Sequence, residues 1–466
     1  MPTPPRADLV VHGGIVVNAD GARPATVIVR AGRVVGLADP DLPPPSHERT
    51  LDAHGQLVIP GGVDPHCHIG QRLGNYQGLD DYETASIAAL CGGTTTIIDF
   101  AIPPAGRSPL DEVRSRRQLA EISRCDTALH GCVTAWDDTT ADQIAVMAAE
   151  GVRTIKMFTT YRDVVMAGPD TVLDVMRSLR ANSGLAYIHA EANHLIEDAQ
   201  TQAAATAHSD ARHLPQTRPE LAEAAAVAQV LAIAEHVGAP VYFVHQTTPA
   251  SIDLIRAARR RGVRAYTETC PHYLALDDGR YQGEHPERYV CCPPLRSAST
   301  VSTLHARVLA GEVDTLGSDH CCFSTAQKTE HSHDVTEMPN GMPGVETRLP
   351  VAYTQLVVRD GLPIERFVAL FATNPARLNG LSSKGAIAVG NDADLVVLDP
   401  HSTRTVATQD LHMATDYSPY EGLVLTGWPS AVVSGGRVVW DADGFHDPGA
   451  IGRTLHADPL PEHLLT

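Results

Sequence analysis

The sequence has no segment of the kind that enters or crosses a membrane. No apolar run reaches the roughly 18 residues that a membrane-spanning helix needs. The N-terminal stretch MPTPPRADLV also lacks the charged-then-apolar order of a secretory signal. We therefore expect a cytoplasmic protein with no membrane partner.

Positive charge is also in short supply. The chain has 36 basic against 55 acidic residues, so its net charge is −19. It has no positive surplus with which to displace counterions from a phosphate backbone. The sequence therefore predicts no nucleic-acid partner.

Cysteine provides no disulfide framework. The nine cysteines are an odd number, are widely spaced, and include no Cys-x-x-Cys pair. In a long chain without a secretory signal, we expect most of them to be reduced and buried. A Gly-rich phosphate loop after an early strand is missing as well, which disfavours an open, doubly wound sheet.

What the sequence does contain is a β-rich segment at each end of the chain. Short strands broken by turn residues are expected at 8–38, 387–400 and 430–441, and we predict that the two ends pair into one small β-sandwich. The predicted domains are the sandwich (1–58 and 381–441), a central segment (59–380) and a C-terminal tail (442–466).

The central segment alternates short apolar runs with longer helical stretches, which is typical of βα units around a parallel sheet. Eight runs are present, as a closed barrel requires. They cover residues 57–68, 94–101, 128–135, 152–158, 185–191, 240–246, 263–270 and 313–320. The predicted fold is α/β: a (β/α)8 TIM-like barrel with a small β-sandwich formed from both chain ends.

Side chains that can bind metals stand at the C-terminal ends of five of these runs. They are His66, His68, Lys156, His189, His245 and Asp319. His66 and His68 have i, i+2 spacing, so on a strand both imidazoles point to the same side, as two ligands of one metal need. A parallel barrel brings the strand ends to one mouth, so we expect all six residues to converge there. Taken singly, each histidine is more often a hydrogen-bonded core residue, and only the whole set favours a metal site.

Lys156 stands in an apolar run, where an ammonium group would lose its hydration. Three explanations are open: a carboxylate partner, an amine that reaches solvent at the strand end, or a neutral amine that CO2 converts to a metal-bridging carbamate. Glu268, Cys270 and His272 also lie at a strand end, and we interpret them as structural.

Twelve segments, taken in order along the chain, form a specific set, although each one alone is weak. They are GGVDPHCH, GGTTTIIDFA, IKMFTTY, IHAE, VYFVH, ETCPHYL, CCPPLR, GSDHC, MPNGMPGVETR, TNPARL, KGAIAVGNDADLVVLDP and DYSPYEG. On this set the chain resembles the cyclic amidohydrolases, and among them the dihydropyrimidinase and D-hydantoinase group most closely.

The resemblance implies a binuclear zinc centre in each subunit. On the matching positions, one zinc ion would be held by His66, His68 and Asp319, and the other by His189 and His245. N6-carboxylated Lys156 and a water or hydroxide would bridge the two ions. The resemblance also suggests a homotetramer, in which the tail after about residue 441 packs on a neighbouring subunit.

The resemblance further implies a small cyclic amide as the substrate. Tyr161 would stabilise the oxyanion, and main-chain groups at Cys292 and Asn340 would hydrogen-bond the ring amide. Asp319 would move the proton to the leaving nitrogen. Dihydropyrimidines or 5-substituted hydantoins would then open to N-carbamoyl amino acids.

Two other functions stay open at this point. The segment ETCPHYL is also similar to allantoinases, which makes allantoin an alternative substrate. Cytoskeletal signalling proteins of the same fold are non-catalytic assembly proteins, but those relatives lack the metal ligands that this chain keeps.

Overall fold

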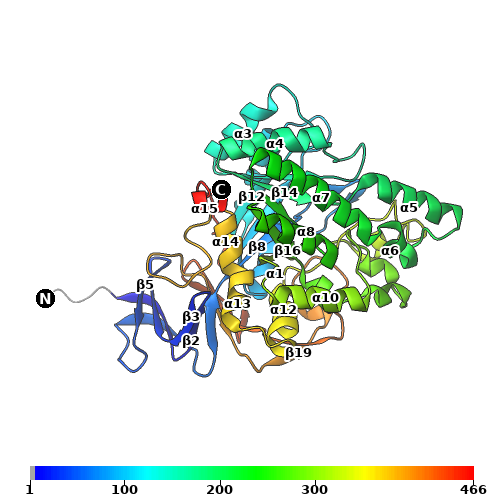
Figure 1. The fold of residues 1–466 in the computed structure, drawn as a ribbon. Coiled ribbons are helices and arrows are strands. Elements are labelled where there is room, and N and C mark those ends of the chain that lie inside the picture. The colour runs from blue at the N-terminus through cyan, green and yellow to red at the C-terminus, as the bar shows by residue number, and fades with distance from the viewer. Residues whose placement is uncertain (1–5, 466) are drawn as a thin grey trace.

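A computed structural model describes residues 6–465 and places eight parallel strands side by side in one sheet (Figure 1). These strands are β8 (Gly62–Cys67), β11 (Thr94–Ala101), β12 (Asp126–Cys132), β13 (Thr154–Phe158), β14 (Leu185–His189), β15 (Val241–Phe243), β16 (Ala265–Thr269) and β17 (Thr315–Leu316). Cys67 and His320 form a parallel bridge between the two edges, and His68 N–H donates to the His320 carbonyl at 2.8 Å. The predicted barrel is confirmed.

The first predicted run, 57–68, is wrong as a single barrel strand. It divides at Gly61 into β7 (Leu57–Pro60) and β8, which belong to different sheets. A side chain on Gly61 would collide with Thr95, so only glycine allows the chain to pass this closely from one sheet to the other. Both strands are almost completely buried, so burial does not separate them, whereas Pro60, Gly61 and Gly62 mark the point of division in the sequence.

Helices alternate with the barrel strands and lie around them, as α3, α4, α7 and α8 show in Figure 1. In α8 the Thr248 side chain accepts the Ser251 N–H, Pro249 occupies the first turn, and Ile252 and Ile255 form the buried face. None of the helices within residues 6–465 is long and apolar enough to cross a membrane.

After β17, α12 continues as a π-helix to Arg359, and α13, a π-helix (Ala369–Thr373) and α14 form one continuous helix. The α-helices differ greatly in length. Their bounds are α1 Tyr82–Cys91, α2 Pro109–Leu119, α3 Thr140–Ala149, α4 Pro169–Ala181, α5 Asn193–Ala205, α6 Leu214–Thr217, α7 Glu220–Val237, α8 Pro249–Arg260, α9 Pro271–Ala275, α10 Ala298–Leu309, α11 Thr325–Thr329, α12 Arg348–Ala352, α13 Ile364–Val368, α14 Asn374–Leu378 and α15 Glu462–Leu465.

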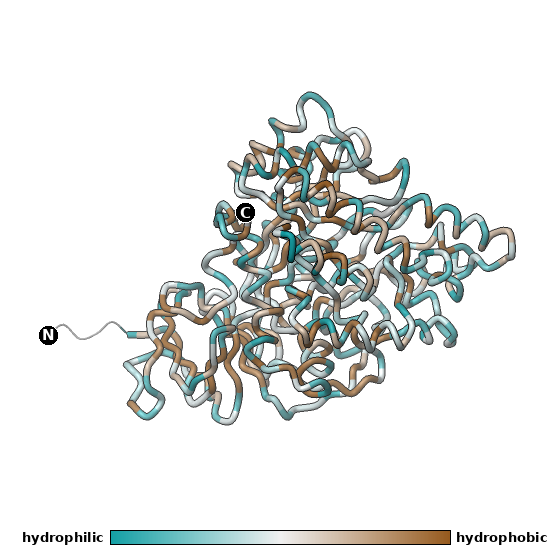
Figure 2. The backbone as a smooth tube through the Cα atoms, viewed as in Figure 1, coloured by the Kyte–Doolittle hydropathy of each residue, from teal (hydrophilic) through white to brown (hydrophobic). Residues whose placement is uncertain are grey.

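Both ends of the chain build the β-sandwich, as predicted. A seven-stranded sheet has the order β23-β22-β21-β18-β7-β2-β3, and a four-stranded sheet has the order β5-β4-β1-β6. Apolar side chains such as Val27, Val29, Leu395 and Val433 fill the space between them, and Figure 2 shows hydrophobic stretches along these strands. The seven-stranded sheet continues to Phe445, four residues beyond the predicted boundary at 441.

The remaining strands complete the two sheets of the sandwich and form two small antiparallel sheets, β9 with β10 and β19 with β20. Their bounds are β1 Ala7–His12, β2 Ile15–Asn18, β3 Gly21–Pro24, β4 Thr26–Arg30, β5 Arg33–Ala38, β6 His47–Asp52, β9 Arg72–Leu73, β10 Tyr76–Gln77, β18 Leu395–Leu398, β19 Thr403–Thr405, β20 Val424–Thr426, β21 Pro429–Ser434, β22 Arg437–Asp441 and β23 Gly444–Phe445.

The tail packs on its own barrel, and its predicted contact with a neighbouring subunit stays a prediction. Gly452 N–H donates to the Ser123 carbonyl, Leu455 N–H to Thr127, and Ala457 N–H to Gly151, all at the N-terminal ends of barrel strands. Leu460 and Leu464 are buried against Leu185 and Tyr187. The tail therefore covers the base of the barrel, opposite the mouth where the metal-type residues lie.

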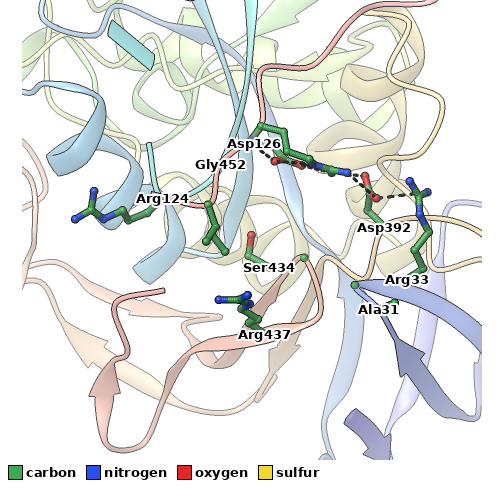
Figure 3. Close-up of a pocket in the computed structure, with 12 residues that line it drawn as sticks. Ala31, Arg33, Arg124, Asp126, Asp392, Ser434, Arg437 and Gly452 are labelled. Atoms are coloured by element: carbon green, nitrogen blue, oxygen red, sulfur yellow. Dashed lines mark hydrogen bonds and ion pairs between the residues drawn. The ribbon is translucent and has the colours of Figure 1, made fainter. Parts of the chain in front are cut away.

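A cavity of about 340 Å³ lies between this base, the sandwich and the tail (Figure 3). Arginines line it, but carboxylates neutralise several of them: Arg453 pairs with Asp126 and Asp392, and Arg33 lies 3.5 Å from Asp392. Buried Lys384 also contacts Asp126 (2.5 Å) and Asp392 (3.2 Å). The cavity is therefore part of an ion-paired joint that fastens the sandwich and the tail to the barrel.

Candidate metal centre and active site

Three of the predicted ligands meet at the C-terminal mouth of the barrel. His66 lies near the end of β8, His68 follows that strand, and Asp319 comes three residues after β17. One Asp319 carboxylate oxygen lies 3.0 Å from His66 Nε2 and 3.4 Å from His68 Nε2. A set of potential ligand atoms from the three residues lies within 4.8 Å of one another, which suits a single metal ion.

The other two histidines form a second pair beside these residues. His189 Nδ1 and His245 Nε2 are 2.9 Å apart. The ring centroids of His245 and His66 are separated by 5.4 Å, so the pair adjoins the first group. The structure thus brings together all four histidines that the sequence predicted to converge.

Lys156 is wholly buried, and its amine lies between the rings of Phe100 and Phe158, close to both sets of histidines. Its Nζ lies 4.5 Å from the centroid of the Phe100 ring, which also packs on His66 and His68, and 4.9 Å from that of Phe158. Within residues 6–465 this Nζ has no hydrogen-bond partner and no paired carboxylate. Two explanations of Lys156, a carboxylate partner and a solvent-reaching amine, therefore do not apply.

Burial disfavours the charged ammonium form and lowers the pKa of Lys156 to about 8, although Asp319 and Glu268 oppose this. A neutral amine, the form that reacts with CO2, is therefore accessible near neutral pH. An orphaned, wholly buried amine at the mouth is what a carbamate-forming lysine requires.

Glu268, which the sequence analysis interpreted as structural, orients His66 of the first group. Its carboxylate accepts hydrogen bonds from His66 Nδ1 at 2.6 Å, from the His245 backbone N–H at 2.9 Å and from the Tyr242 hydroxyl at 2.7 Å. The bond to Nδ1 fixes the His66 ring so that Nε2 faces Asp319. In metal sites, a carboxylate that does not itself bind the metal commonly orients a histidine ligand in this way. Gly317 lets this carboxylate approach, since a Cβ there would lie 2.8 Å from it.

Negative charge dominates the surroundings of His66. Burial alone would lower its pKa, but the carboxylates of Glu268 and Asp319 raise it to about 9. Surroundings that stabilise a protonated imidazole stabilise a metal cation in the same place for the same electrostatic reason.

Glu191 plays the corresponding part for the second pair, and sequence reasoning missed it. Its carboxylate lies 2.7 Å from His189 Nε2 and also accepts a hydrogen bond from buried Arg218. Although burial opposes this, Arg218 and His189 lower the pKa of Glu191 to about 2, so the group is ionised. The signal that could have found it is a carboxylate two residues after a candidate ligand, in the segment IHAE.

Three predicted site residues have left-handed backbone conformations that residues other than glycine rarely adopt. The φ angles are 68° at Tyr161, 38° at His245 and 50° at Asp319. Each such residue costs on the order of 1–3 kcal/mol, and this kind of strain gathers at functional sites. The strain directs two ligand side chains and one tyrosine to the mouth just where their strands end.

Tyr161 lies beside the second pair, with its ring centroid 5.4 Å from that of His189. Burial raises the pKa of its hydroxyl well above the usual range, so the phenol stays neutral and can donate a hydrogen bond. The Arg218 guanidinium lies 4.9 Å from the centroid of its ring. The neighbouring Cys292 side chain also raises the pKa of the Tyr161 hydroxyl, so a third predicted residue lies on this side of the mouth.

The loops that carry Cys292 and Asn340 are joined to each other. Gly341 N–H donates to the Val290 carbonyl at 3.0 Å, and Asn340 Oδ1 has no hydrogen-bond partner among the described residues. All nine predicted site residues therefore lie on the strand ends or loops of one mouth. Contact of Tyr161, Cys292 and Asn340 with a substrate stays a prediction.

Three other groups of metal-type residues occur among the described residues, and each has partners within the protein. One of them, Asp126, Asp392 and Asp394, surrounds Lys384. In the group of Asp80, His320 and Cys322, His320 Nε2 bonds Asp80 at 2.7 Å and Nδ1 accepts the Gly344 N–H at 3.0 Å. In the group of Cys91, Glu346 and His412, the Glu346 carboxylate accepts a hydrogen bond from His412 Nδ1 at 2.8 Å. The nine cysteines are free and buried, as predicted.

Comparison with known proteins gives a consistent result. A sequence model of the amidohydrolase family matches residues 57–439. The chain belongs to the amidohydrolase family. Dihydropyrimidinase of Rattus norvegicus is 36% identical over 470 residues, which cover 99% of this chain and 91% of that protein. D-phenylhydantoinase of Escherichia coli O1:K1 / APEC is 34% identical over 464 residues, which cover 98% and 100% respectively.

Solved structures agree with this membership. D-hydantoinase from Bacillus sp. AR9 superposes with a TM-score of 0.93 at 32% identity and covers 97% of this chain and 99% of that one. L-hydantoinase from Arthrobacter aurescens gives a TM-score of 0.89 at 28% identity, with coverage of 97% and 100%. Amidohydrolases are typically metal-dependent, and the cluster of His66, His68 and Asp319 at this chain's barrel mouth fits a metal ion.

We predict that Glu268→Gln lowers metal affinity about 10- to 100-fold, because the charge that orients His66 is lost. Metal content after dialysis against graded chelator measures the effect. Glu346→Gln is the matched control, since Glu346 is equally buried but belongs to the group around His412. Normal affinity in Glu268→Gln, or loss of metal in the control, would contradict this assignment of the centre.

Proposed function

We propose that this amidohydrolase is a zinc-dependent cyclic amidase that opens dihydropyrimidine or 5-substituted hydantoin rings to N-carbamoyl amino acids. The observation that carries the proposal is the convergence of five ligand-type side chains around the partnerless amine of Lys156. Relatives named dihydropyrimidinase and D-phenylhydantoinase, which align with nearly the whole chain, support the choice of ring.

The residues that would hold the metals follow from the two groups. His66, His68 and Asp319 would hold one zinc ion, His189 and His245 the other, and carboxylated Lys156 would bridge them. When bound, zinc lowers the pKa of a coordinated water to near neutrality and so supplies hydroxide at physiological pH.

The protein's own groups would handle charge and protons around the ring. Despite burial, His66 and the neighbouring imidazoles hold the pKa of Asp319 well below its usual range, so its carboxylate is ionised. In the proposed reaction this carboxylate would accept a proton and pass it to the leaving ring nitrogen. The neutral hydroxyl of Tyr161 would donate to the oxyanion that forms at the attacked carbonyl. Main-chain groups at Cys292 and Asn340 would hold the ring amide in position relative to Asp319 and Tyr161.

The test of this function is a panel of rings offered to the zinc-loaded enzyme: dihydrouracil, 5-substituted hydantoins and allantoin. We expect hydrolysis of the first two, loss of activity with chelator, and recovery with zinc. A higher kcat/KM on allantoin would replace the proposal with the allantoinase alternative. Folded, metal-loaded protein that opens none of these rings would refute the cyclic amidase and favour a non-catalytic role.

We predict that Lys156 carries the carbamate, and the chain is suited to show it because it has only three lysines. Growth or reconstitution with ¹³C-bicarbonate should give a lysine carbamate signal by NMR that Lys156→Ala removes. This variant should lose bound metal, and kcat should fall about 10³-fold or more, as expected when several kcal/mol of stabilisation disappear.

Lys156→Arg gives the sharper comparison, because a guanidinium keeps its charge and does not form the carbamate. We expect it to be as inactive as the alanine variant. Wild-type metal content and rate in either variant would refute the carbamate.

We also propose that the enzyme is a homotetramer in the cytoplasm. The support for this assembly is the likeness to the hydantoinase group. The tail gives no separate support, because the contacts that it makes in the structure are with its own barrel. Light scattering on the purified chain tests the assembly, and a monomer at micromolar concentration would refute it.

A further inference from the structure

All three lysines of this chain are buried, although it has 36 basic residues. Lys156 and Lys328 are 0% exposed and Lys384 is 7% exposed. Lys156 lies at the metal centre, and Lys384 pairs with three aspartates at the base of the barrel. Among the described residues, Lys328 lies neither at the metal centre nor beside a carboxylate partner, so its burial needs a different explanation.

Lys328 contacts main-chain carbonyl groups from two different loops. Its Nζ donates to the Val290 carbonyl at 2.8 Å and to the Pro339 carbonyl at 2.8 Å. Within the described part of the chain it forms no ion pair, so these two carbonyls are its hydrogen-bond acceptors. Burial lowers the pKa of Lys328 to about 8, which reflects the cost of keeping an ammonium group there.

The two loops are those that carry the predicted ring-binding groups. Val290 precedes Cys292 by two residues, and Pro339 directly precedes Asn340. The Val290 carbonyl also accepts the Gly341 N–H at 3.0 Å, so the backbone hydrogen bond and the Lys328 amine lie side by side across the same junction.

Packing alone does not require a lysine at this place. A methionine side chain of similar length would fill the same space without the cost of burying a charge. What methionine could not supply is several N–H donors on one atom, which can hold two carbonyl groups from separate loops at a fixed distance.

We propose that Lys328 is a positioning residue that fixes the main chain at Cys292 against the main chain at Asn340, and thereby sets the spacing of the groups that hold the ring amide. This inference rests on the proposed function, because that function gives Cys292 and Asn340 their roles. Lys328 itself does not touch the substrate.

The helix that carries Lys328 is anchored independently of this junction. α11 begins at the Ser324 cap, whose side chain accepts the Gln327 N–H, and the Gln327 side chain accepts the Ser324 N–H in return. Gln327 also donates to the Gln77 carbonyl at 3.0 Å. Ser324→Ala removes the cap but keeps the Lys328 side chain and both of its carbonyl acceptors, so we use it as the matched control.

The test compares steady-state kinetics of Lys328→Met and Ser324→Ala holoenzymes on the best ring of the panel. In Lys328→Met we expect KM to rise about tenfold while kcat stays within about threefold, because ring contacts are made equally in the ground state and the transition state. Metal content should equal that of wild type. Ser324→Ala should show wild-type KM.

Lys328→Gln keeps an amide NH2 group on a shorter side chain, so it should give an intermediate KM. This second variant keeps the test valid if Lys328→Met does not fold. An unchanged KM in both Lys328 variants would overturn the proposal. So would an equal rise in Ser324→Ala, or a loss of metal that accounts for the kinetic defect.

Hydrogen exchange provides a readout that needs no substrate. In metal-loaded Lys328→Met or Lys328→Gln, amides of residues 288–296 and 338–342 should exchange faster than in wild type and in Ser324→Ala. Unchanged exchange would overturn the proposal even if the rings are opened. Faster exchange with no ring opened by the wild-type enzyme would instead show that the cyclic amidase proposal had failed while the Lys328 junction stood.

Discussion

The Glu268 carboxylate receives hydrogen bonds from His66 Nδ1, the His245 N–H and the Tyr242 hydroxyl, and it lies against Gly317. Its partners come from the first, sixth and last segments of the barrel, so one buried group fixes the approach of three strand ends. A buried carboxylate is costly unless such donors surround it. The geometry of the metal centre therefore depends on the barrel's register, because a one-residue shift of β15 or β16 would separate Glu268 from these donors.

Much of this arrangement could be predicted because it is local in the sequence. The i, i+2 spacing of His66 and His68 and the apolar runs of the barrel depend only on neighbouring residues. The function of Glu268 could not be predicted in this way, because it needs the pairing of β15 with β16 and the nearness of β8. At Gly61 the sequence marks the point where the apolar run divides, but the close approach to Thr95 that requires glycine there is a tertiary contact. Lys328 lies in a polar segment that gives no indication of burial.

The two ends of the barrel differ in how completely their charged side chains are paired. At the base, Lys384 and Arg453 are matched by Asp126, Asp392 and Asp394, so the charges neutralise one another and hold the sandwich and tail in place. At the mouth, Arg218 pairs with Glu191, but within residues 6–465 the Lys156 amine has no hydrogen-bond or ion-pair partner and His66 lies among carboxylates. A site whose charges the protein leaves unpaired can bind a cation and hold a modified lysine. A site whose charges are all paired stabilises the fold.

This division also bears on how the enzyme would choose its substrates. If the proposed function holds, main-chain groups at Cys292 and Asn340, fixed by Lys328, would recognise only what all candidate rings share, the amide itself. Discrimination among ring substituents must therefore come from side chains on other loops around the mouth, because a contact common to all substrates changes their affinities equally. A defect in the Lys328 junction should consequently raise KM by the same factor for every ring the enzyme accepts, and leave its order of preference unchanged.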